Sequence, residues 1–220
     1  MSIPTKELVK EFFELSTPCV SDACDRLKIK CGCHGIKPIV FGKKIVGPAF
    51  TVKYVPVGGV KGTAGDFIDD VNEGEVVVID NGGRTYCTVW GDIMSYLAIN
   101  KKIAGTIIDG VCRDVDGIRK MGYAMFSKDY FMVTGKDRVM LQSVNEMVSI
   151  SDVQVSPGDL IMADDSGVLV IPKDRAEEIL KGAVKIDEAE KNIIGELKKG
   201  STLREARVKF NYHKLQRSKE

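Results

Sequence analysis

The chain has 220 residues, 44% of them hydrophobic and 29% charged, and its formal net charge is +1. This length is enough for one domain with a substantial core, and the near-neutral charge argues against nucleic acid as a partner. No run approaches the roughly 18 apolar residues of a membrane span, and the first residues lack the form of a signal peptide. We expect a single domain over residues 1–220, in the cytoplasm and without a membrane partner.

The N-terminal part of the chain predicts two helices followed by strands. Apolar residues at helical spacing follow Pro4-Thr5, which indicates a first amphipathic helix. Ser16 or Thr17 is expected to begin a second helix, with Pro18 in its first turn. Residues 38–55 predict strands, with a bend or bulge at Gly47-Pro48.

Residues 57–65 are rich in glycine but have neither the P-loop nor the dinucleotide-binding spacing. We interpret them as the rim of a substrate pocket. A short helix over residues 66–71 and a strand over 75–80 are predicted to follow. Residues 81–84 are expected to form a loop at the carboxyl end of that strand, which makes Arg84 a candidate contact for an anion.

The most informative stretch is residues 90–114. Asp92 follows a glycine and precedes an apolar run, as expected of a helix N-cap, and residues 103–108 predict a strand buried on both faces. Arg113 and Asp114 then stand at the start of another helix. Ligands of open α/β sheets bind beyond the carboxyl ends of the strands, so Asp92 is expected to meet Arg113-Asp114 at that edge.

These residue types suit a 2-oxo acid and a divalent cation. A helix N-terminus and an arginine fork both bind carboxylates, and two carboxylates attract a hard cation such as Mg²⁺. The cation would act as a Lewis acid on the keto oxygen. The alternative is structural: both acids would only cap helices, and Arg113-Asp114 would be a surface ion pair.

The C-terminal part predicts strands over residues 149–155, 160–163 and 168–171, joined by polar turns. A long helix over residues 173–199 should follow, and Gly200 is expected to end it. The basic segment 201–220 is interpreted as a solvated helix or tail.

Six cysteines, at positions 19, 24, 31, 33, 87 and 112, are expected to be thiols. Cys31, Cys33 and His34 form the one suggestive cluster for a metal, but the second ligand pair of a zinc ribbon is missing. We therefore favour small buried thiols in a loop. Cys112 lies beside Arg113, yet no histidine near it in sequence would serve as its base.

The motifs resemble those of a known family. Asp92, twenty intervening residues and then Arg113-Asp114 resemble the Asp-x20-Arg-Asp motif of the 4-hydroxy-4-methyl-2-oxoglutarate aldolases, which are grouped with the regulator of ribonuclease activity A-like (RraA-like) proteins. The sequences TPCVSDA at 17–23, GPAFTV at 47–52 and PGDLIMADDSGV at 157–168 resemble other motifs of the family, in family order. The resemblance covers about residues 15–200.

The resemblance implies a layered α/β fold of the swivelling β/β/α type, with N-terminal helices and a long C-terminal helix. It implies a homotrimer or homohexamer with sites between subunits. It also implies a metal-dependent, class II aldolase that cleaves a 4-hydroxy-2-oxo acid through a pyruvate enolate, with oxaloacetate decarboxylation as a side activity.

By the same resemblance, Asp114 binds Mg²⁺ or Mn²⁺ directly, whereas Asp92 and Glu190 bind it through water. Glu190 occupies the place of an acid that comes from a neighbouring subunit, and Asp187, Glu188 and Glu196 are its competitors on the predicted helix.

The substrate would be held by Arg113, which clamps its carboxylate and keto end. Backbone N–H groups at the helix start that follows Gly91, at Ile93 and Met94, would assist. Arg84 remains a candidate second anion contact.

Two other functions stay open. One is a non-catalytic protein that binds a ribonuclease, although the intact set Asp92, Arg113 and Asp114 argues against it. The other is a metal-dependent lyase that acts on a sugar acid, because residues 128–139 depart from the family pattern and leave the distal part of the substrate undefined. A Schiff-base aldolase would need a buried, activated lysine, and no lysine lies in an apolar strand core.

Overall fold

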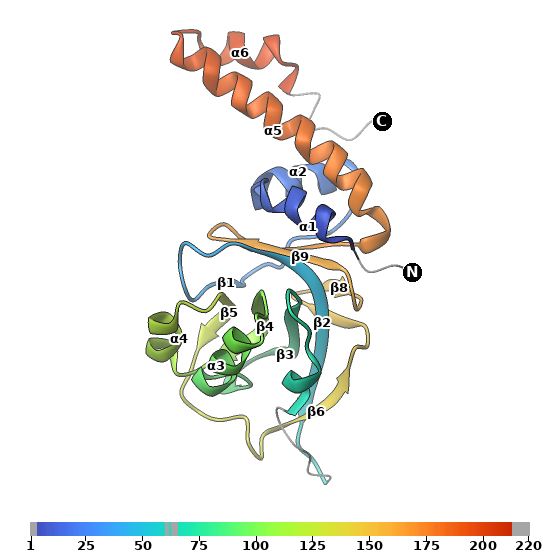
Figure 1. Cartoon of the computed structure of the whole chain (residues 1–220), viewed down its shortest axis with the longest axis vertical. Coiled ribbons are helices and arrows are strands. Elements are labelled where there is room, and N and C mark those ends of the chain that lie inside the picture. The colour runs from blue at the N-terminus through green and yellow to red at the C-terminus, as the bar shows by residue number, and fades with distance from the viewer. Residues whose placement is uncertain (1–3, 60–61, 63–65, 213–220) are drawn as a thin grey trace.

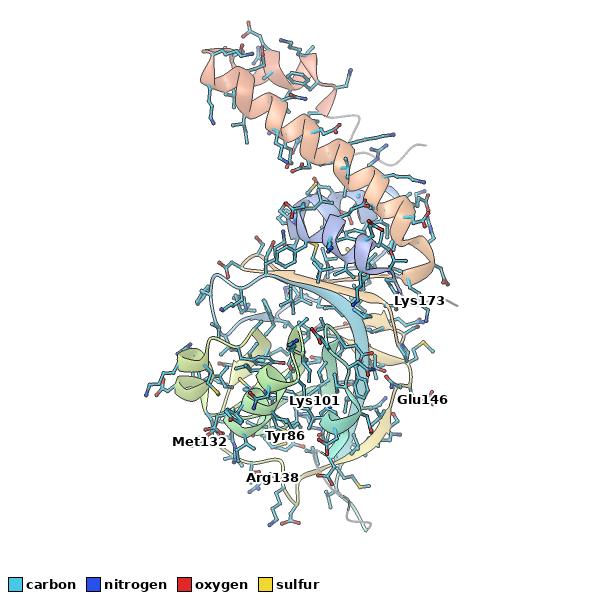
Figure 2. The ribbon with its side chains drawn as sticks, viewed as in Figure 1. Tyr86, Lys101, Met132, Arg138, Glu146 and Lys173 are labelled. Carbon is cyan, nitrogen blue, oxygen red and sulfur yellow. The ribbon has the colours of Figure 1, made fainter. Side chains whose placement is uncertain are left out.

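The computed structural model describes residues 4–59, 62 and 66–212 as one mixed α/β domain (Figure 1). The helices are α1 (Lys6–Phe13), α2 (Thr17–Arg26), α3 (Asp92–Asn100), α4 (Val115–Met121), α5 (Ala176–Lys198) and α6 (Leu203–Lys209), with 3-10 turns at η1 (Asp66–Asp70) and η2 (Lys173–Arg175). The strands are β1 (Lys37–Pro38), β2 (Ile45–Pro56), β3 (Val76–Thr88), β4 (Gly105–Cys112), β5 (Met125–Tyr130), β6 (Val139–Val144), β7 (Val148–Ile150), β8 (Val153–Val155), β9 (Leu160–Asp164) and β10 (Gly167–Ile171). The expected α/β class, with helices at the start and a long helix near the end, is confirmed.

The main sheet has the strand order β1-β5-β4-β3-β2-β9-β10, and β6 also pairs with β2. Strands β2, β3, β4 and β5 are parallel neighbours, whereas β9 and β10 run antiparallel. The long strand β2 pairs with β9 through its first residues and with β3 and β6 through later ones. A bridge between Gly32 and Leu169 brings the β10 edge back toward β1, so the sheet is nearly closed.

Three apolar clusters fill the layers. One lies between the parallel strands and the helices α3 and α4, and it includes Ile79, Ile108 and Ile118. A second fills the inner side of the curved sheet. The third joins the outer face of β9 and β10 to α1, α2 and the first turns of α5, with Phe12 and Ile179 fully buried. Beyond this contact, α5 projects away from the sheet and α6 folds back along it (Figure 1).

The helix ends follow the sequence closely. Thr5 and Ser16 cap α1 and α2 through their side chains. At the end of α5, the Gly200 N–H donates to Leu197 O and the Ser201 N–H donates to Glu196 O, which is a Schellman motif with glycine in the left-handed conformation. The basic segment contains α6, while residues 213–220 lie outside the described part of the chain.

Two sequence-based expectations are wrong in detail. Residues 81–84 belong to β3 rather than to a loop, because the strand bulges, with Gly82 and Gly83 at positive φ, and then pairs with β4 again. The expected strand over residues 149–155 is a hairpin of β7 and β8, because Ser151 and Asp152 are both left-handed and reverse the chain.

A buried charge network crosses the middle of the parallel strands. Asp80 and Asp109 are direct neighbours in β3 and β4, and both are nearly inaccessible. Lys53 of β2 lies 3.7 Å from Asp80, and Lys128 of β5 lies 2.5 Å from Asp109. The β7–β8 hairpin closes over them, with the Ser151 N–H donating to Asp109 at 2.9 Å. Both lysines are therefore paired with carboxylates, which is unlike the activated lysine of a Schiff-base enzyme.

The contact of Gly47 with the turn before β3 predicts a stability effect. A Cβ on Gly47 would lie 2.3 Å from the Gly74 carbonyl oxygen and 3.1 Å from Val76 Cγ2. We expect Gly47→Ala to lower the free energy of unfolding by about 1–3 kcal/mol, because the backbone must move to relieve the overlap. Urea denaturation at a fixed protein concentration measures this change.

Gly195→Ala is the matched control, because nothing lies within 4 Å of the position that a Cβ would take outside the helix's own backbone. It should raise the free energy of unfolding by up to about 1 kcal/mol, since alanine favours a helix interior. Equal effects of the two substitutions would contradict the packing argument.

Within the described residues, no helix is long and apolar enough to cross a membrane.

Candidate functional site

The structure brings Asp92, Arg113 and Asp114 together where two helices begin. Asp92 starts α3, and Arg113 and Asp114 lie between the end of β4 and the start of α4. Arg113 Nε is 3.2 Å from Asp114 Oδ2, and the Asp92 main-chain N–H donates to the same oxygen at 3.4 Å. The expectation that the two acid-bearing turns share one edge of the sheet is confirmed.

Asp92 differs from the expectation in one respect. The N-cap of α3 is Gly91, which is extended, and Asp92 is the first residue of the helix. Its Oδ1 accepts the N–H of Ile93 at 2.8 Å. Ile93 and Met94 were the two expected backbone donors for the substrate. The Asp92 carboxylate already accepts the N–H of Ile93, whereas Met94 lines the neighbouring cleft.

The loop before α3 is fixed by a chain of hydrogen bonds. The Arg113 N–H donates to Trp90 O at 3.0 Å, which ties the end of β4 to the start of α3. Trp90 Nε1 donates to Ser95 Oγ at 2.8 Å, and Ser95 Oγ donates to Gly91 O at 3.0 Å. The Trp90 ring also stacks on Tyr123. These buried bonds hold the three charged residues on rigid backbone.

Gly91 permits the close approach of Asp114. A Cβ on Gly91 would lie 2.5 Å from Asp114 Oδ2, so a side chain there would displace the carboxylate. Asp114 itself has φ 56° and ψ 37°, a left-handed conformation that is uncommon for residues other than glycine and that aspartate tolerates better than most. The close approach to Gly91 and the left-handed backbone together fix where the Asp114 carboxylate lies.

The donor set fits a hard divalent cation in part. Asp92 and Asp114 supply carboxylate oxygens, which Mg²⁺ and Mn²⁺ prefer, and Mg²⁺ commonly takes one or two carboxylates and keeps several waters. The described residues of one chain hold no group of three or more His, Cys, Asp or Glu side chains suited to a metal. With these two carboxylates, water would fill the remaining positions around the cation.

A cleft of about 500 Å³ opens beside these residues. Arg113 and Gly91 line one part of it, and Lys136 and Thr134 line another. Of the glycine-rich segment predicted as a pocket rim, Gly62 lines the cleft, whereas residues 60, 61 and 63–65 lie outside the described residues. The Arg113 side chain is 40% exposed, and its terminal nitrogens make no hydrogen bond to another described residue.

Arg84 takes a different position from the one expected. Its Nη1 donates to Asn81 O at 2.7 Å and approaches Tyr54 O at 3.5 Å. The guanidinium therefore braces the bulge of β3 and is bound to main-chain oxygens. It is not among the residues that line the described cleft.

Glu190 belongs to the second half of α5, and Figure 1 shows that this helix projects away from α3 and α4 of its own chain. Its Oε1 accepts a hydrogen bond from Tyr212 Oη at 3.0 Å. Burial and this carboxylate raise the pKa of Tyr212, so the phenol stays protonated and donates. The single chain does not bring Glu190 to the other three residues.

The thiols show no sign of nucleophilic activation near the cleft. All six cysteines are buried and free. Burial raises the pKa of the Cys112 thiol despite its contact with Ser127, and a protonated thiol is a poor nucleophile. Cys31, Cys33 and His34 do not belong to a metal-binding group among the described residues.

The sequence analysis left the role of residues 128–139 open, and the structure places Thr134, Gly135 and Lys136 of this segment on the rim of the cleft. The segment reaches the cleft because Thr88 at the end of β3 pairs with it: the Thr88 N–H donates to Val133 O at 3.0 Å. Gly135 and Lys136 were the sequence features that could have indicated this rim. Their place in the fold was not predicted, because Thr88, with which the segment pairs, lies more than forty residues away in the sequence.

Comparisons with known proteins agree with this fold. A family model described as RraA-like, Aldolase/RraA, matches residues 17–170. Protein DlpA of Legionella pneumophila is 40% identical over 209 residues, which are 93% of this chain but only 34% of DlpA, so the chain spans about a third of that relative. A putative 4-hydroxy-4-methyl-2-oxoglutarate aldolase of Halalkalibacterium halodurans is 30% identical, covering 84% of this chain and 86% of the relative.

A solved structure of an uncharacterized protein from Pseudomonas syringae pv. tomato has a TM-score of 0.89 and 40% identity, with coverage of 94% of this chain and 100% of the other. The family model includes the strands and helices that carry Asp92, Arg113 and Asp114. The chain therefore belongs to the RraA-like family.

Proposed function

We propose that the protein is a divalent-metal-dependent aldolase that cleaves a 4-hydroxy-2-oxo acid, such as 4-hydroxy-4-methyl-2-oxoglutarate, to pyruvate and a second carbonyl compound. The observation that carries the proposal is the meeting of Asp92, Arg113 and Asp114 beside one cleft. The name of the relative from Halalkalibacterium halodurans supports the same reaction class.

Asp114 would hold the cation, with the Asp92 carboxylate beside it. When bound, Mg²⁺ or Mn²⁺ supplies a Lewis acid that stabilises negative charge on the keto oxygen of the substrate. The left-handed backbone of Asp114 and its contact with Arg113 Nε support this role, because they hold the carboxylate in one place.

Arg113 would bind the substrate carboxylate and keto end. Its Nε is engaged with Asp114, so the terminal nitrogens are the atoms available for a fork onto an anion. In the cleavage, the 4-hydroxyl group loses its proton to solvent and the C3–C4 bond breaks, so that C4 becomes the carbonyl carbon of the second product. The electron pair becomes a pyruvate enolate whose charge Arg113 stabilises, and a proton from solvent added at C3 gives pyruvate. Loss of CO₂ from oxaloacetate gives the same enolate, so oxaloacetate decarboxylation is the expected side activity.

Glu190 would complete the site from a neighbouring copy of the chain, in a homotrimer or homohexamer. Two facts support this arrangement. The described residues of one chain hold no group of three or more His, Cys, Asp or Glu side chains suited to a metal, and Glu190 belongs to a helix that projects away from its own body (Figure 1).

The direct test is pyruvate release from oxaloacetate and from 4-hydroxy-4-methyl-2-oxoglutarate. We expect turnover of both with Mg²⁺ or Mn²⁺, loss of turnover with EDTA, and recovery when the cation is restored in excess. Divalent cations alone also promote decarboxylation of oxaloacetate, so the enzyme-free rate is subtracted at each cation concentration.

Other outcomes would redirect the proposal. Decarboxylation without aldol cleavage would retain the enolate chemistry and point to another 2-oxo acid, including a sugar acid. No metal-dependent turnover of either compound by a folded protein would contradict the aldolase proposal and favour the ribonuclease-binding alternative.

A further inference from the structure

Two cationic side chains line the same cleft. Arg113 belongs to the site described above, and Lys136 lies in the segment between β5 and β6. The Lys136 ammonium makes no hydrogen bond or ion pair with another described residue. It is thus a cation at a cleft, without a structural partner among the residues that the structure describes.

The backbone of this segment is held firmly against the end of β3. The Thr88 N–H and Oγ1 both donate to Val133 O, at 3.0 and 3.1 Å. A Cβ on Gly135 would lie 2.4 Å from Thr88 O, so the two backbones touch. The Lys136 N–H donates to Thr134 Oγ1 at 3.2 Å. The position of Lys136 therefore follows from main-chain contacts rather than from its own side chain.

The same short stretch anchors Arg113. Thr88 holds the Lys136 segment, and Trp90 O accepts the Arg113 N–H at 3.0 Å. The two anchors are two residues apart, which is roughly 7 Å along extended chain. The backbones that carry Lys136 and Arg113 are therefore anchored on one short stretch, and both residues line the same cleft.

We propose that Lys136 is a specificity-determining residue that binds an anionic group at the distal end of the substrate, opposite the end held by Arg113. The proposal rests on the proposed 2-oxo-acid chemistry of this cleft. An ammonium on a flexible stem binds a carboxylate as a point charge and does not require the planar geometry of arginine.

Asp66 and Asp137 also line the cleft, and they supply the competing hypothesis. Carboxylates would accept hydrogen bonds from the hydroxyl groups of a sugar acid and would repel a distal carboxylate. Under that hypothesis, 2-oxo acids with a neutral, hydroxylated distal end bind better than dicarboxylates, and removal of the Lys136 charge has little effect.

The test is binding of two unreactive 2-oxo acids that differ only in the distal group. 2-Oxoglutarate and 2-oxopentanoate have the same carbon chain, and neither carries the 4-hydroxyl that aldol cleavage needs. Calorimetry with Mg²⁺ present would compare wild type with Lys136→Met, which keeps the length of the side chain and removes its charge. Lys120→Met on α4, an exposed lysine outside the cleft lining, is the control for net charge.

We expect Lys136→Met to weaken binding of 2-oxoglutarate about 10- to 100-fold, the usual loss for a hydrogen bond to a charged group. Its affinity for 2-oxopentanoate should stay unchanged, and Lys120→Met should bind both acids as wild type does. Wild-type binding of both acids with no change in Lys136→Met would overturn the role of Lys136 and leave the aldolase proposal standing. Failure of wild type to bind either acid would overturn both.

Discussion

Replacement of Asp114 by asparagine is expected to lower kcat/KM for metal-dependent pyruvate release by about 10³-fold, which corresponds to roughly 4 kcal/mol of transition-state stabilisation. Asparagine removes the negative charge that would hold the cation but accepts a left-handed φ of 56° as readily as aspartate does. The variant should therefore keep the local backbone. The measurement is turnover of oxaloacetate and 4-hydroxy-4-methyl-2-oxoglutarate across a range of Mn²⁺ concentrations.

Asp116→Asn provides the matched control for this substitution. Asp116 lies in the first turn of α4, two residues further along the chain, and is exposed. The control changes the net charge by the same amount and costs at most about 1 kcal/mol of helix-dipole stabilisation. Activity in Asp114→Asn that remains both high and dependent on metal would show that another residue holds the cation.

The part of the site that the sequence predicts is the part built from local structure. Asp92 and Arg113-Asp114 stand at helix starts, and each start is marked by neighbouring residues: a glycine before one and a buried strand before the other. Parallel strands place such starts at one edge of the sheet. The local sequence signals and this rule of sheet topology were therefore enough to predict that Asp92 lies close to Arg113 and Asp114.

The parts that the sequence did not predict depend on distant pairing. The bulge that keeps residues 81–84 inside β3 exists because β4 pairs on both sides of it, and the hydrogen bonds that draw Arg84 onto main-chain oxygens follow from that bulge. Lys136 reaches the cleft only through Thr88. Periodicity and turn chemistry report on neighbours in sequence, so they carry no signal for contacts of this kind.

The role proposed for Glu190 depends on neither local structure nor pairing within one chain, but on how the chains assemble. The α5 helix packs on α1 and α2 through its first turns, where Ile179 and Ala183 are fully buried. Its far half keeps Ile194 and Leu197 partly exposed. Contacts between chains set the place of this carboxylate in an oligomer, and an experiment on mixed chains tests it.

Mixing two inactive variants should restore activity if Glu190 serves a neighbouring subunit. Glu190→Gln removes the charge but can still accept the hydrogen bond from Tyr212, and we expect it to lower activity about 10- to 100-fold, as loss of an outer metal partner does. Asp114→Asn chains lack the proposed cation ligand but keep Glu190. In a ring assembled at random from equal amounts of the two chains, about a quarter of the sites would combine an intact Asp114 with an intact neighbouring Glu190.

Co-expressed or co-refolded mixtures are therefore expected to recover about a quarter of wild-type activity, whereas each variant alone stays low. Glu188→Ala, an exposed acid two residues away on the same helix, should behave as wild type and shows whether a general loss of charge on α5 matters. If Glu190 acted within its own chain, no mixture could rebuild a complete site, because every chain carries one of the two lesions. Recovery of activity in the mixture thus requires that one subunit supply the Glu190 carboxylate to the site of its neighbour. If activity did not recover, the projecting half of α5 would have a role in assembly alone.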